Sequence, residues 1–407
     1  MATTRTTEND DDDRAVFEQN TRTDPRSQEI ASECRRRLME SIKKIAGITK
    51  PETRGLLLSG GVDSTAILEA AAEQGIVFAL AITVVVINDE NDNCNHYYDA
   101  PDDLYAHNAT QRHGLNHVVV RLTTAELVEK YTERTIETVQ VWGRMDVRNS
   151  LVISAGMDEA RKHGIEDLLI GDAADEIFGG YPFMFGNPNE HPDRWREHRD
   201  NMVHQWTFVT QKLARSFGLI AHEPFMDREL LVDWALTLDR KDCTTDDRCL
   251  IQLKLGGPRT VQTVGKMPLR EAFPNTPSAW RRMDFIDVGS GALVVDESSH
   301  RYFSWPGEHN VSDQEFFSEK ERLQRDEGIC IQHKEHLFNI RIYQKLFGGL
   351  VHPTKQRFPV GDPRGCVACT FEIGKDLFCH QCDTYPAQQW KIDELLGLAK
   401  TTRRNVM

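Results

Sequence analysis

The stretch that decides the fold reads Gly55-Leu56-Leu57-Leu58-Ser59-Gly60-Gly61-Val62-Asp63-Ser64. A short apolar run breaks at two glycines and continues into residues 64–73, whose composition favours a helix, so the stretch predicts strand, turn and helix. The N–H groups and the dipole of a helix N-terminus converge on such a turn and favour an anion. A pyrophosphate fits there, because the glycines allow close approach, the serines donate and Asp63 offers a hard oxygen to magnesium. The alternative is a purely structural strand-to-helix turn.

Similar strand and helix signals alternate on both sides of this stretch. Apolar runs cover residues 76–87, 117–122 and 167–171, and helical patterns cover residues 102–113 and a segment ending near 162–164. This alternation predicts an α/β fold with a doubly wound parallel sheet, whose ligands lie at the carboxyl ends of the strands. Amphipathic helices are expected at residues 27–48 and 335–347, and the chain beyond Asn189 is expected to be mostly helical.

A second motif follows the apolar run at residues 167–171. It reads Gly171-Asp172-Ala173-Ala174-Asp175-Glu176-Ile177-Phe178-Gly179-Gly180-Tyr181. Its carboxylates come at the end of an expected strand, with small residues between them that leave room for a ligand. Asp175 suits magnesium, and Asp172 suits proton transfer, because a carboxylate beside an amine nucleophile can take its proton. The alternative is a solvated acidic loop that caps a helix.

Together the two motifs resemble a known enzyme family. The segment Ser59–Ser64 resembles the PP-loop of ATP pyrophosphatases, which split ATP between its α and β phosphates and adenylate a substrate. The second motif is similar to the signature of asparagine synthetases, in which a glutamate thought to be the base on the nitrogen nucleophile stands where this chain has Asp172. The resemblance implies ATP and Mg²⁺ as cofactors, and it covers residues 26–349. The residues expected to contact the nucleotide are Leu58, Ser59, Gly60, Gly61, Asp63, Ser64 and Gly171, with Asp63 and Asp175 as magnesium ligands.

Two later segments extend the resemblance but depart from the family at three positions. Residues 217–227 are similar to a family segment in which a glutamate and an arginine stand where this chain has Ile220 and His222. Residues 266–273 and 280–285 are similar to a helix and the loop after it, where the family usually has a lysine that stabilises the transition state. Met283 stands at that position, so Arg281 or Arg282 is expected to supply the charge, unless both are ordinary surface residues.

The ends of the chain set the expected domain limits. Residues 1–26 contain an acidic block and few apolar residues, so we expect a disordered acidic tail. The synthetase-like domain is expected at residues 27–350 and a flexible tail at 396–407. Only 58 residues precede Ser59, too few for the glutaminase domain of the family. The nitrogen source is then ammonia, an amine on a substrate, or ammonia from a separate chain.

Four of the nine cysteines form two CxxC pairs, Cys366/Cys369 and Cys379/Cys382. Four thiolates can close a tetrahedron around Zn²⁺ and leave no position for water, so the pairs predict a structural zinc module at residues 351–395. The alternative is a set of reduced or redox-active thiols. No disulfide framework is expected.

Composition narrows the class of protein. Hydrophobic residues make up 39% of the 407 residues, enough for a sizeable core. The formal net charge of -14 does not favour binding to nucleic acid. Membrane insertion is not expected because no apolar run reaches about 18 residues, and the acidic start does not resemble a secretory signal, so a cytoplasmic location is expected.

The sequence therefore predicts an AMP-forming carbon–nitrogen ligase. It would adenylate a small-molecule carboxylate, release pyrophosphate, and form an amide or other C–N bond with ammonia or an amine. One alternative is a sulfur-transfer or tRNA-modifying PP-loop enzyme, several of which carry cysteine-rich zinc modules. Another is a nucleotide-binding protein that has lost catalysis. The carboxylate and the oligomeric state cannot be read from the sequence.

Overall fold

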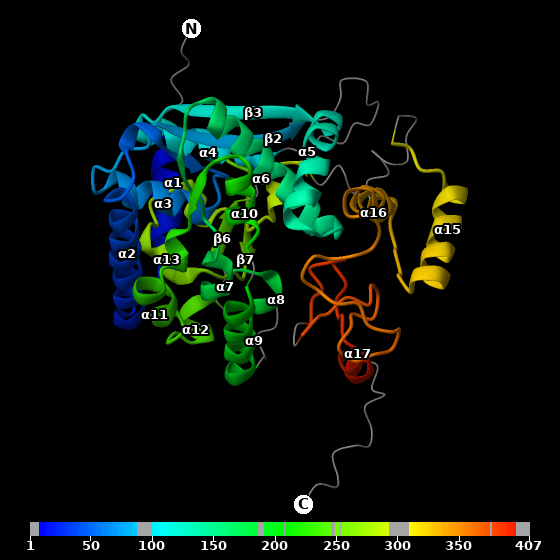
Figure 1. Cartoon of the computed structure of the whole chain (residues 1–407). Coiled ribbons are helices and arrows are strands. Elements are labelled where there is room, and N and C mark those ends of the chain that lie inside the picture. Colours follow the sequence, from blue (N-terminus) through cyan, green and yellow to red (C-terminus); the bar gives the residue numbers. More distant parts are fainter. Residues whose placement is uncertain are drawn as a thin grey trace, which may run out of the picture. The chain divides into compact units, whose positions relative to one another are not determined.

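Strand β1 (Arg54–Leu57) occupies the centre of a five-stranded parallel sheet in the computed structural model of the chain (Figure 1). The strand order is β3-β2-β1-β4-β5, and Leu56 pairs with Ala81 on one side and Leu169 on the other. The other strands are β2 (Leu80–Ile87), β3 (His117–Thr123), β4 (Asp167–Leu169) and β5 (Ile220–His222). The structure describes residues 8–87, 100–185, 191–206, 208–245, 249–252, 254–292, 309–374 and 377–395.

Helices cover both faces of this sheet. Leu56 and Leu58 belong to a buried cluster that includes Ala66 and Ile67 of α3 (Val62–Ala72). Leu57 points to the other face, where a Cβ on Gly156 of α6 (Arg144–Lys162) would meet it. Successive side chains of a strand point to opposite faces, so burial on both sides explains the uninterrupted apolar run at residues 55–58. The prediction of a doubly wound α/β sheet is confirmed.

The crossover point of the sheet lies next to β1. The chain passes from β1 to β2 on one side, whereas β4 and β5 lie on the other side. In open α/β sheets, ligands bind where the strand order reverses, outside the carboxyl ends of the strands. The loops that follow β1 and β4 are the two predicted motifs, so the topology brings both to this point.

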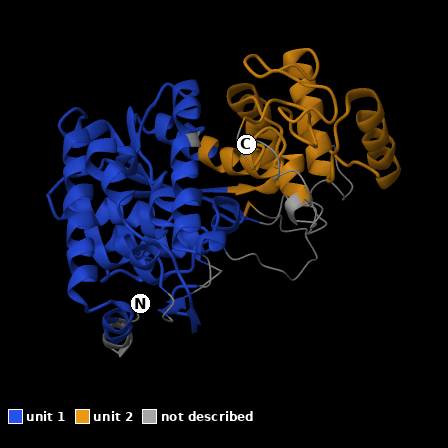
Figure 2. Ribbon diagram, turned by 90° about the horizontal axis from the view of Figure 1, so that it is seen from below, with its two compact units in different colours: residues 1–87, 98–121, 155–291 blue, residues 88–97, 122–154, 292–407 orange. Residues whose placement is uncertain are grey.

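Contacts divide the chain into two compact units (Figure 2). The first comprises residues 1–87, 98–121 and 155–291, and the second residues 88–97, 122–154 and 292–407. The divisions at residues 121/122 and 154/155 fall inside β3 and α6. Besides α3, the helices within the first unit are α1 (Glu8–Asn20), α2 (Pro25–Ala46), α4 (Pro101–His113), α7 (Ala174–Phe178), α8 (Pro182–Phe185), α9 (Pro192–Gln205), α10 (Thr210–Ser216), α11 (Asp233–Ala235), α12 (Arg240–Cys243), α13 (Met267–Ala272) and α14 (Ile286–Gly289).

The first unit also contains strands where the sequence predicted mostly helix. β5 has three residues and pairs with β4 over Asp167–Leu169. β6 (Cys249–Gln252) and β7 (Arg259–Gln262) form an antiparallel pair. These strands have three or four residues each, too few to show a clear alternation in sequence. The helices predicted at 27–48 and 335–347 are confirmed as α2 and α16 (Lys334–Phe347).

The prediction of a disordered tail was wrong over residues 8–26. α1 covers residues 8–20, and Phe17 is buried in a cluster with Ile251, Met267 and Trp280. The side-chain amide of Asn20 bonds both the N–H and the C=O of Leu250 (2.8 and 2.9 Å). A short segment of low overall hydrophobicity is therefore ordered by two adjacent apolar residues, Val16 and Phe17, and one amide. Residues 1–7 and 396–407, where tails were also expected, lie outside the described residues.

The second unit contains the cysteine pairs together with helices from two other parts of the chain. Trp142 contacts the rings of Tyr343 and Phe371, with centroid distances of 4.8 and 5.2 Å, and its backbone N–H donates to the carbonyl of Gln381 (3.1 Å). The expected module at residues 351–395 is therefore packed into a larger unit and does not stand alone. The helices of this unit are α5 (Thr124–Val139), α15 (Asp313–Arg322), α16 and α17 (Gln389–Leu395).

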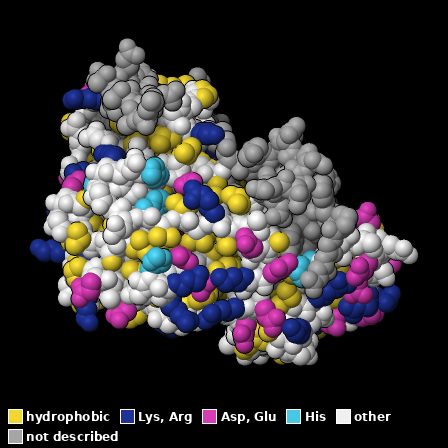
Figure 3. Space-filling view, turned by 90° about the horizontal axis from the view of Figure 1, so that it is seen from above, with side chains coloured by type: hydrophobic (Ala, Val, Ile, Leu, Met, Phe, Trp, Pro, Cys, Tyr) yellow, Lys and Arg dark blue, Asp and Glu magenta, His cyan; other side chains and the backbone are white. Residues whose placement is uncertain are grey.

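Charged side chains of both signs lie interspersed on the face drawn in Figure 3. No described helix combines the length and the apolar composition that crossing a bilayer requires.

Candidate functional site

Gly171 is the point where the two predicted motifs touch. A Cβ at this position would lie 3.1 Å from Cβ of Asp63 and 3.2 Å from the backbone N of Ser64. Both distances are shorter than ordinary van der Waals contact, so a side chain at residue 171 would force its neighbours to shift. The loop after β4 therefore packs this closely against the start of α3 because residue 171 is a glycine. The glycine thereby sets the spacing between the two sets of carboxylates.

The loop between β1 and α3 is held by its own hydroxyl groups. The backbone N of Ser59 lies 3.2 Å from Oγ of Ser64, and the N–H of Gly61 donates to Oγ of Ser59 (3.3 Å). Gly60 has a φ of +69°, and a Cβ there would lie 2.5 Å from the backbone N of Ala106. Only glycine meets both demands. The first N–H groups of α3 have no partner within the helix and are available to an anion.

A carboxylate–lysine centre, made of Asp63, Asp175 and Lys266, lies directly beside this loop. Nζ of Lys266 is 2.6 Å from Oδ2 of Asp63 and 2.8 Å from Oδ1 of Asp175. The lysine side chain is 3% exposed. The backbone of Lys266 has a φ of +59°. This conformation costs on the order of 1 kcal/mol in a non-glycine residue and often marks a functional site.

The protonation of this centre is set by burial and by the three charges. Burial raises the pKa of Asp63 to about 6, the Lys266 ammonium opposes the rise, and the negative charge of Asp175 adds to it. Burial lowers the pKa of Lys266, but the two carboxylates outweigh it and the pKa is raised overall. Lys266 is therefore an ammonium at neutral pH, and Asp63 is predominantly a carboxylate.

The centre also fits a divalent cation. Asp63 and Asp175 lie close enough to share one ammonium, so they can share one metal ion. Oδ1 of Asp63 is buried without a hydrogen-bond partner among the described residues. Two carboxylates beside a helix N-terminus that favours anions are the ligand type that Mg²⁺ prefers, and phosphate and water oxygens can complete its shell.

Asp172 lies in the same loop as Gly171 and Asp175. Its Oδ2 accepts a hydrogen bond from the hydroxyl of Thr210, the first residue of α10. Burial raises the pKa of Asp172 to about 6, the Thr210 hydrogen bond opposes this shift, and Asp175 adds to it. A carboxylate whose pKa lies near the working pH is suited to accept a proton.

The structure adds two acidic side chains that the sequence analysis did not single out. Glu223, directly after β5, accepts a hydrogen bond from Nε2 of Gln211 (2.6 Å), and its Oε1 is buried without a partner among the described residues. Burial raises the pKa of Glu223 to about 7, and the charge of Asp172 adds to the rise.

The second acidic side chain is Glu176, which accepts a hydrogen bond from the Tyr181 hydroxyl (2.5 Å). Burial raises the pKa of Glu176 to about 7, and the charge of Asp175 adds to the rise. Glu176 stood within the quoted motif, whereas Glu223 depended on the unpredicted strand β5.

Arg281 and Arg282, the two expected sources of positive charge, differ in their surroundings. Arg281 is 3% exposed, and its guanidinium bonds Oδ1 of Asp102 (2.5 Å) and the carbonyl of Ser59 (3.0 Å). Arg281 therefore stabilises the loop between β1 and α3 through the carbonyl of Ser59. Arg282 is 39% exposed and pairs with Asp284 (2.5 Å). The structure shows Lys266, which the sequence analysis assigned no role, as the cation in contact with the two carboxylates.

Three further positions named in the sequence analysis, Leu58, His222 and Ile220, differ in their surroundings. Both backbone groups of Leu58 are engaged, its N–H with the carbonyl of Ile82 (2.8 Å) and its C=O with the hydroxyl of Thr83 (2.6 Å). His222 bonds Oδ1 of Asp167 (2.7 Å). Ile220 is 59% exposed.

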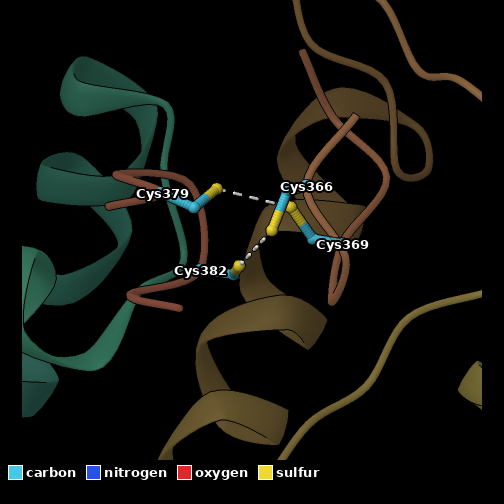
Figure 4. A group of neighbouring side chains, drawn as sticks. All are labelled: Cys366, Cys369, Cys379 and Cys382. Atoms are coloured by element: carbon cyan, nitrogen blue, oxygen red, sulfur yellow. Dashed lines mark hydrogen bonds between the residues drawn. The ribbon is translucent and has the colours of Figure 1, made fainter. Parts of the chain in front are cut away.

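The four predicted zinc ligands converge in the second unit (Figure 4). Sγ of Cys366 is 3.7 Å from Sγ of Cys382, and Sγ of Cys369 is 3.6 Å from Sγ of Cys379. All four residues are buried, and their ligand atoms lie within 4.8 Å of one another. Sulfurs bound at about 2.3 Å to one tetrahedral ion are about 3.8 Å apart. We call this group the four-cysteine cluster; its spacing fits a single metal ion.

Comparison with known families bears directly on the site. The family model for asparagine synthase matches residues 35–208, a region that contains β1 to β4 and both carboxylate motifs. The resemblance to asparagine synthetases is confirmed. The asparagine synthase region, residues 35–208, therefore supplies Asp63, Asp172 and Asp175, whereas Lys266 and Glu223 lie beyond it.

Curated relatives give the same result. An asparagine synthetase [glutamine-hydrolyzing] of Brassica oleracea is 26% identical over 192 residues, 46% of this chain and 31% of that protein. A protein of Dictyostelium discoideum named "probable asparagine synthetase [glutamine-hydrolyzing]" is 26% identical over 323 residues, 72% of this chain and 52% of that protein. The chain thus spans between about a third and about half of the length of these relatives.

Among solved structures, similarity is found to NMN synthetase from Francisella tularensis, with 15% identity, a TM-score of 0.23, and coverage of 38% of this chain and 58% of that chain. The U34-tRNA thiolase NcsA from Methanococcus maripaludis is 12% identical with a TM-score of 0.26, over 86% of this chain and 89% of that chain.

Proposed function

We propose that this protein is an ATP-dependent ligase that adenylates a carboxylate and then joins the acyl group to ammonia or an amine, releasing pyrophosphate and AMP. The observation that carries the proposal is the carboxylate–lysine centre, in which one ammonium bridges Asp63 and Asp175 beside the glycine loop. An anion-binding turn, two metal-ligating carboxylates and one cation are the groups that an attack on a phosphate requires. The match of residues 35–208 to asparagine synthase supports the same chemistry.

In the first step, the loop Ser59–Ser64 binds the phosphates of ATP. A carboxylate oxygen of the substrate attacks the α-phosphorus, the bond to the β-phosphate oxygen breaks, and pyrophosphate leaves with the negative charge. Asp63 and Asp175 would hold Mg²⁺, which would neutralise charge on the phosphates. Lys266 moves its contact from the carboxylates to the developing negative charge, and Arg281 keeps the loop in place through the Ser59 carbonyl.

In the second step, the nitrogen nucleophile attacks the carbonyl carbon of the acyl-adenylate. The C–O bond to AMP breaks, and the proton lost from nitrogen goes to Asp172. Two observations support Asp172 in this role: it is held by Thr210, and its pKa is raised to about 6, which leaves it mostly deprotonated at neutral pH.

The four-cysteine cluster has a structural role in this proposal. Four buried thiolates around Zn²⁺ leave no open coordination position for a substrate. Its contribution is to hold together the segments that pack on Trp142. Reduced thiols of this kind suit a reducing compartment such as the cytoplasm.

The test is a two-stage assay of the full chain with ATP, magnesium and a panel of carboxylic acids, with and without ammonium or amines. Acid-dependent release of pyrophosphate, followed by an amide product and AMP in mass spectra, is the expected result. Asp63→Asn should abolish both, whereas Asp103→Asn on α4 should leave both unchanged. Release of ADP and phosphate, or pyrophosphate release that requires tRNA and a sulfur donor, would refute the proposal.

A further inference from the structure

A cavity of about 240 Å³ lies in the first unit next to the carboxylate–lysine centre. We call it the Met283 pocket; it is lined by Pro182, Phe185, Arg270, Arg282, Met283 and the segment 262–265. Gly265 lines the pocket and directly precedes Lys266, so it joins the pocket to the centre. It packs tightly there, because a Cβ on Gly265 would clash with the backbone of Gly179 and Gly180. A molecule in this pocket would therefore lie beside the groups that handle the phosphates.

The lining of the Met283 pocket is apolar with a positive edge. Pro182, Phe185, Val264 and Met283 contribute hydrophobic surface. Arg270 and Arg282 are the charged residues among those that line the pocket within the described part of the chain; Arg270 bonds backbone carbonyls, whereas Arg282 is paired with Asp284. Nε of Arg270 donates to the carbonyl of Gly265 (2.9 Å), and this bond holds the Arg270 side chain in place along one side of the pocket. A mainly apolar lining with the Arg270 cation at one side suits an acid that has an uncharged body.

Exposed aromatic rings continue the apolar surface. Phe183, next to Pro182, stacks on Tyr181 at a centroid distance of 5.4 Å, and Phe285 stacks on the same ring at 6.2 Å. Phe183 is 61% exposed and Phe285 is 38% exposed. Exposed apolar patches mark interaction sites, and ligand-binding grooves are one class of these.

We propose that the Met283 pocket binds the body of the carboxylic acid substrate, and that this acid carries an aromatic or branched aliphatic group instead of a second charge. The inference rests on the proposed ligase function and adds the class of substrate to it. An apolar cavity of about 150 Å³ accepts benzene, so 240 Å³ has room for a phenyl ring with a short carboxylate arm. Met283 is the specificity-determining residue in this proposal, because it lines the pocket with an uncharged side chain that offers nothing to a second anionic group.

The experiment measures binding of phenylacetate and of succinate to the full chain by calorimetry and ligand-observed NMR, with and without a non-hydrolysable ATP analogue and magnesium. We expect phenylacetate to bind at least tenfold more tightly than succinate, and to stay bound when the analogue is added. Tighter binding of succinate, or displacement of phenylacetate by the analogue, would overturn the proposal. The second outcome would mean that the nucleotide occupies the pocket.

Variants at the pocket sharpen the test. Met283→Trp fills the cavity and should weaken phenylacetate binding at least tenfold, whereas Ile48→Trp, at a position that is 78% exposed and does not line the pocket, should change nothing. Met283→Lys keeps the size of the side chain and should reverse the preference toward succinate, even if the tryptophan variant folds poorly. Unchanged phenylacetate binding in Met283→Lys would overturn the proposal.

Parallel measurement of pyrophosphate release separates this inference from the function on which it rests. Phenylacetate that binds in the pocket without supporting pyrophosphate release, while no other acid supports it, would contradict the ligase. Pyrophosphate release with succinate or aspartate but not with any apolar acid would contradict the pocket and leave the ligase standing.

Discussion

The carboxylate–lysine centre and the four-cysteine cluster are both groups of metal-ligating or charged side chains withdrawn from solvent, yet they are assembled in different ways. Lys266 and Asp63 are 203 residues apart in sequence, and the packing of α13 against α3 brings them together. Cys366 and Cys382 are 16 residues apart, on a segment with few regular elements. The first group is therefore held by the fold around it, whereas the second must help to hold its own segment. Substitutions in the first should change chemistry, and substitutions in the second should change stability.

The largest effect should come from opening the four-cysteine cluster. Cys379→Ser should release about one zinc ion per chain and destabilise the second unit by several kcal/mol, because metal binding contributes directly to folding in small cysteine modules. Metal analysis and urea unfolding monitored by tryptophan fluorescence would measure both. Cys330→Ser, a cysteine outside the cluster, is the matched control. Wild-type zinc content in Cys379→Ser would contradict the assignment.

The next effect tests the other side of the comparison. Lys266→Met should lower the rate of pyrophosphate release by about 10²- to 10³-fold, the usual loss when one preorganised charge is removed from a transition state. The matched control is Lys162→Met, because Lys162 also pairs with two carboxylates, Asp158 and Glu159, but its side chain is 50% exposed. Equal losses in the two variants would show that ion pairing alone, not position in the carboxylate–lysine centre, explains the effect.

A somewhat smaller and more selective effect is expected for the proposed base. Asp172→Asn should slow amide formation about 10²-fold while pyrophosphate release changes little, since the proton is taken in the second step. Rapid-quench measurement of the two steps would separate them, and the acyl-adenylate should accumulate or hydrolyse. Equal slowing of both steps would instead assign Asp172 to phosphate chemistry.

The smallest effect is a shift in pH dependence. The base must be ionised, so the rate of amide formation should rise with pH up to about 6 and level off above it, following the raised pKa of Asp172. Thr210→Val removes a hydrogen bond that favours the carboxylate, so the pKa should rise further and the profile should move up by about half to one pH unit. A shift to lower pH would contradict the assignment of this proton acceptor.

The two groups also differ in how far sequence could predict them. The CxxC spacing specifies four thiolates within one short segment, and the structure brings all four together. At the carboxylate–lysine centre, the positions of the strand ends predicted that the loops carrying Asp63 and Asp175 meet. The structure shows both carboxylates in contact with the ammonium of Lys266. Lys266 could not be foreseen, because its placement depends on a left-handed backbone conformation and on the packing of α13. Glu223 was missed because β5 is three residues long.

Arg281 illustrates why residue type alone is insufficient. A paired arginine on a loop suggested a free charge for the transition state, yet the buried guanidinium is engaged by Asp102 and by the carbonyl of Ser59. Nothing in the sequence near Arg281 indicates Asp102, which lies 179 residues away. α1 presents the same limit, because the partner that orders Phe17 is a hairpin more than 200 residues later.

The contact between Asn20 and Leu250 has a consequence for the behaviour of the protein in concentrated solution. The amide bonds the N–H and C=O of Leu250 as a neighbouring strand would, and two residues further along β6 the carbonyl of Gln252 accepts from the N–H of Arg282. The edge of β6 that faces away from β7 is thus closed by one side chain and one loop. Strand edges left open are templates for intermolecular pairing and aggregation. Asn20, at the end of α1, therefore protects this edge of β6 from pairing with another molecule. A shortened chain that begins after Asn20 would leave the N–H and C=O of Leu250 unpaired and should aggregate more readily.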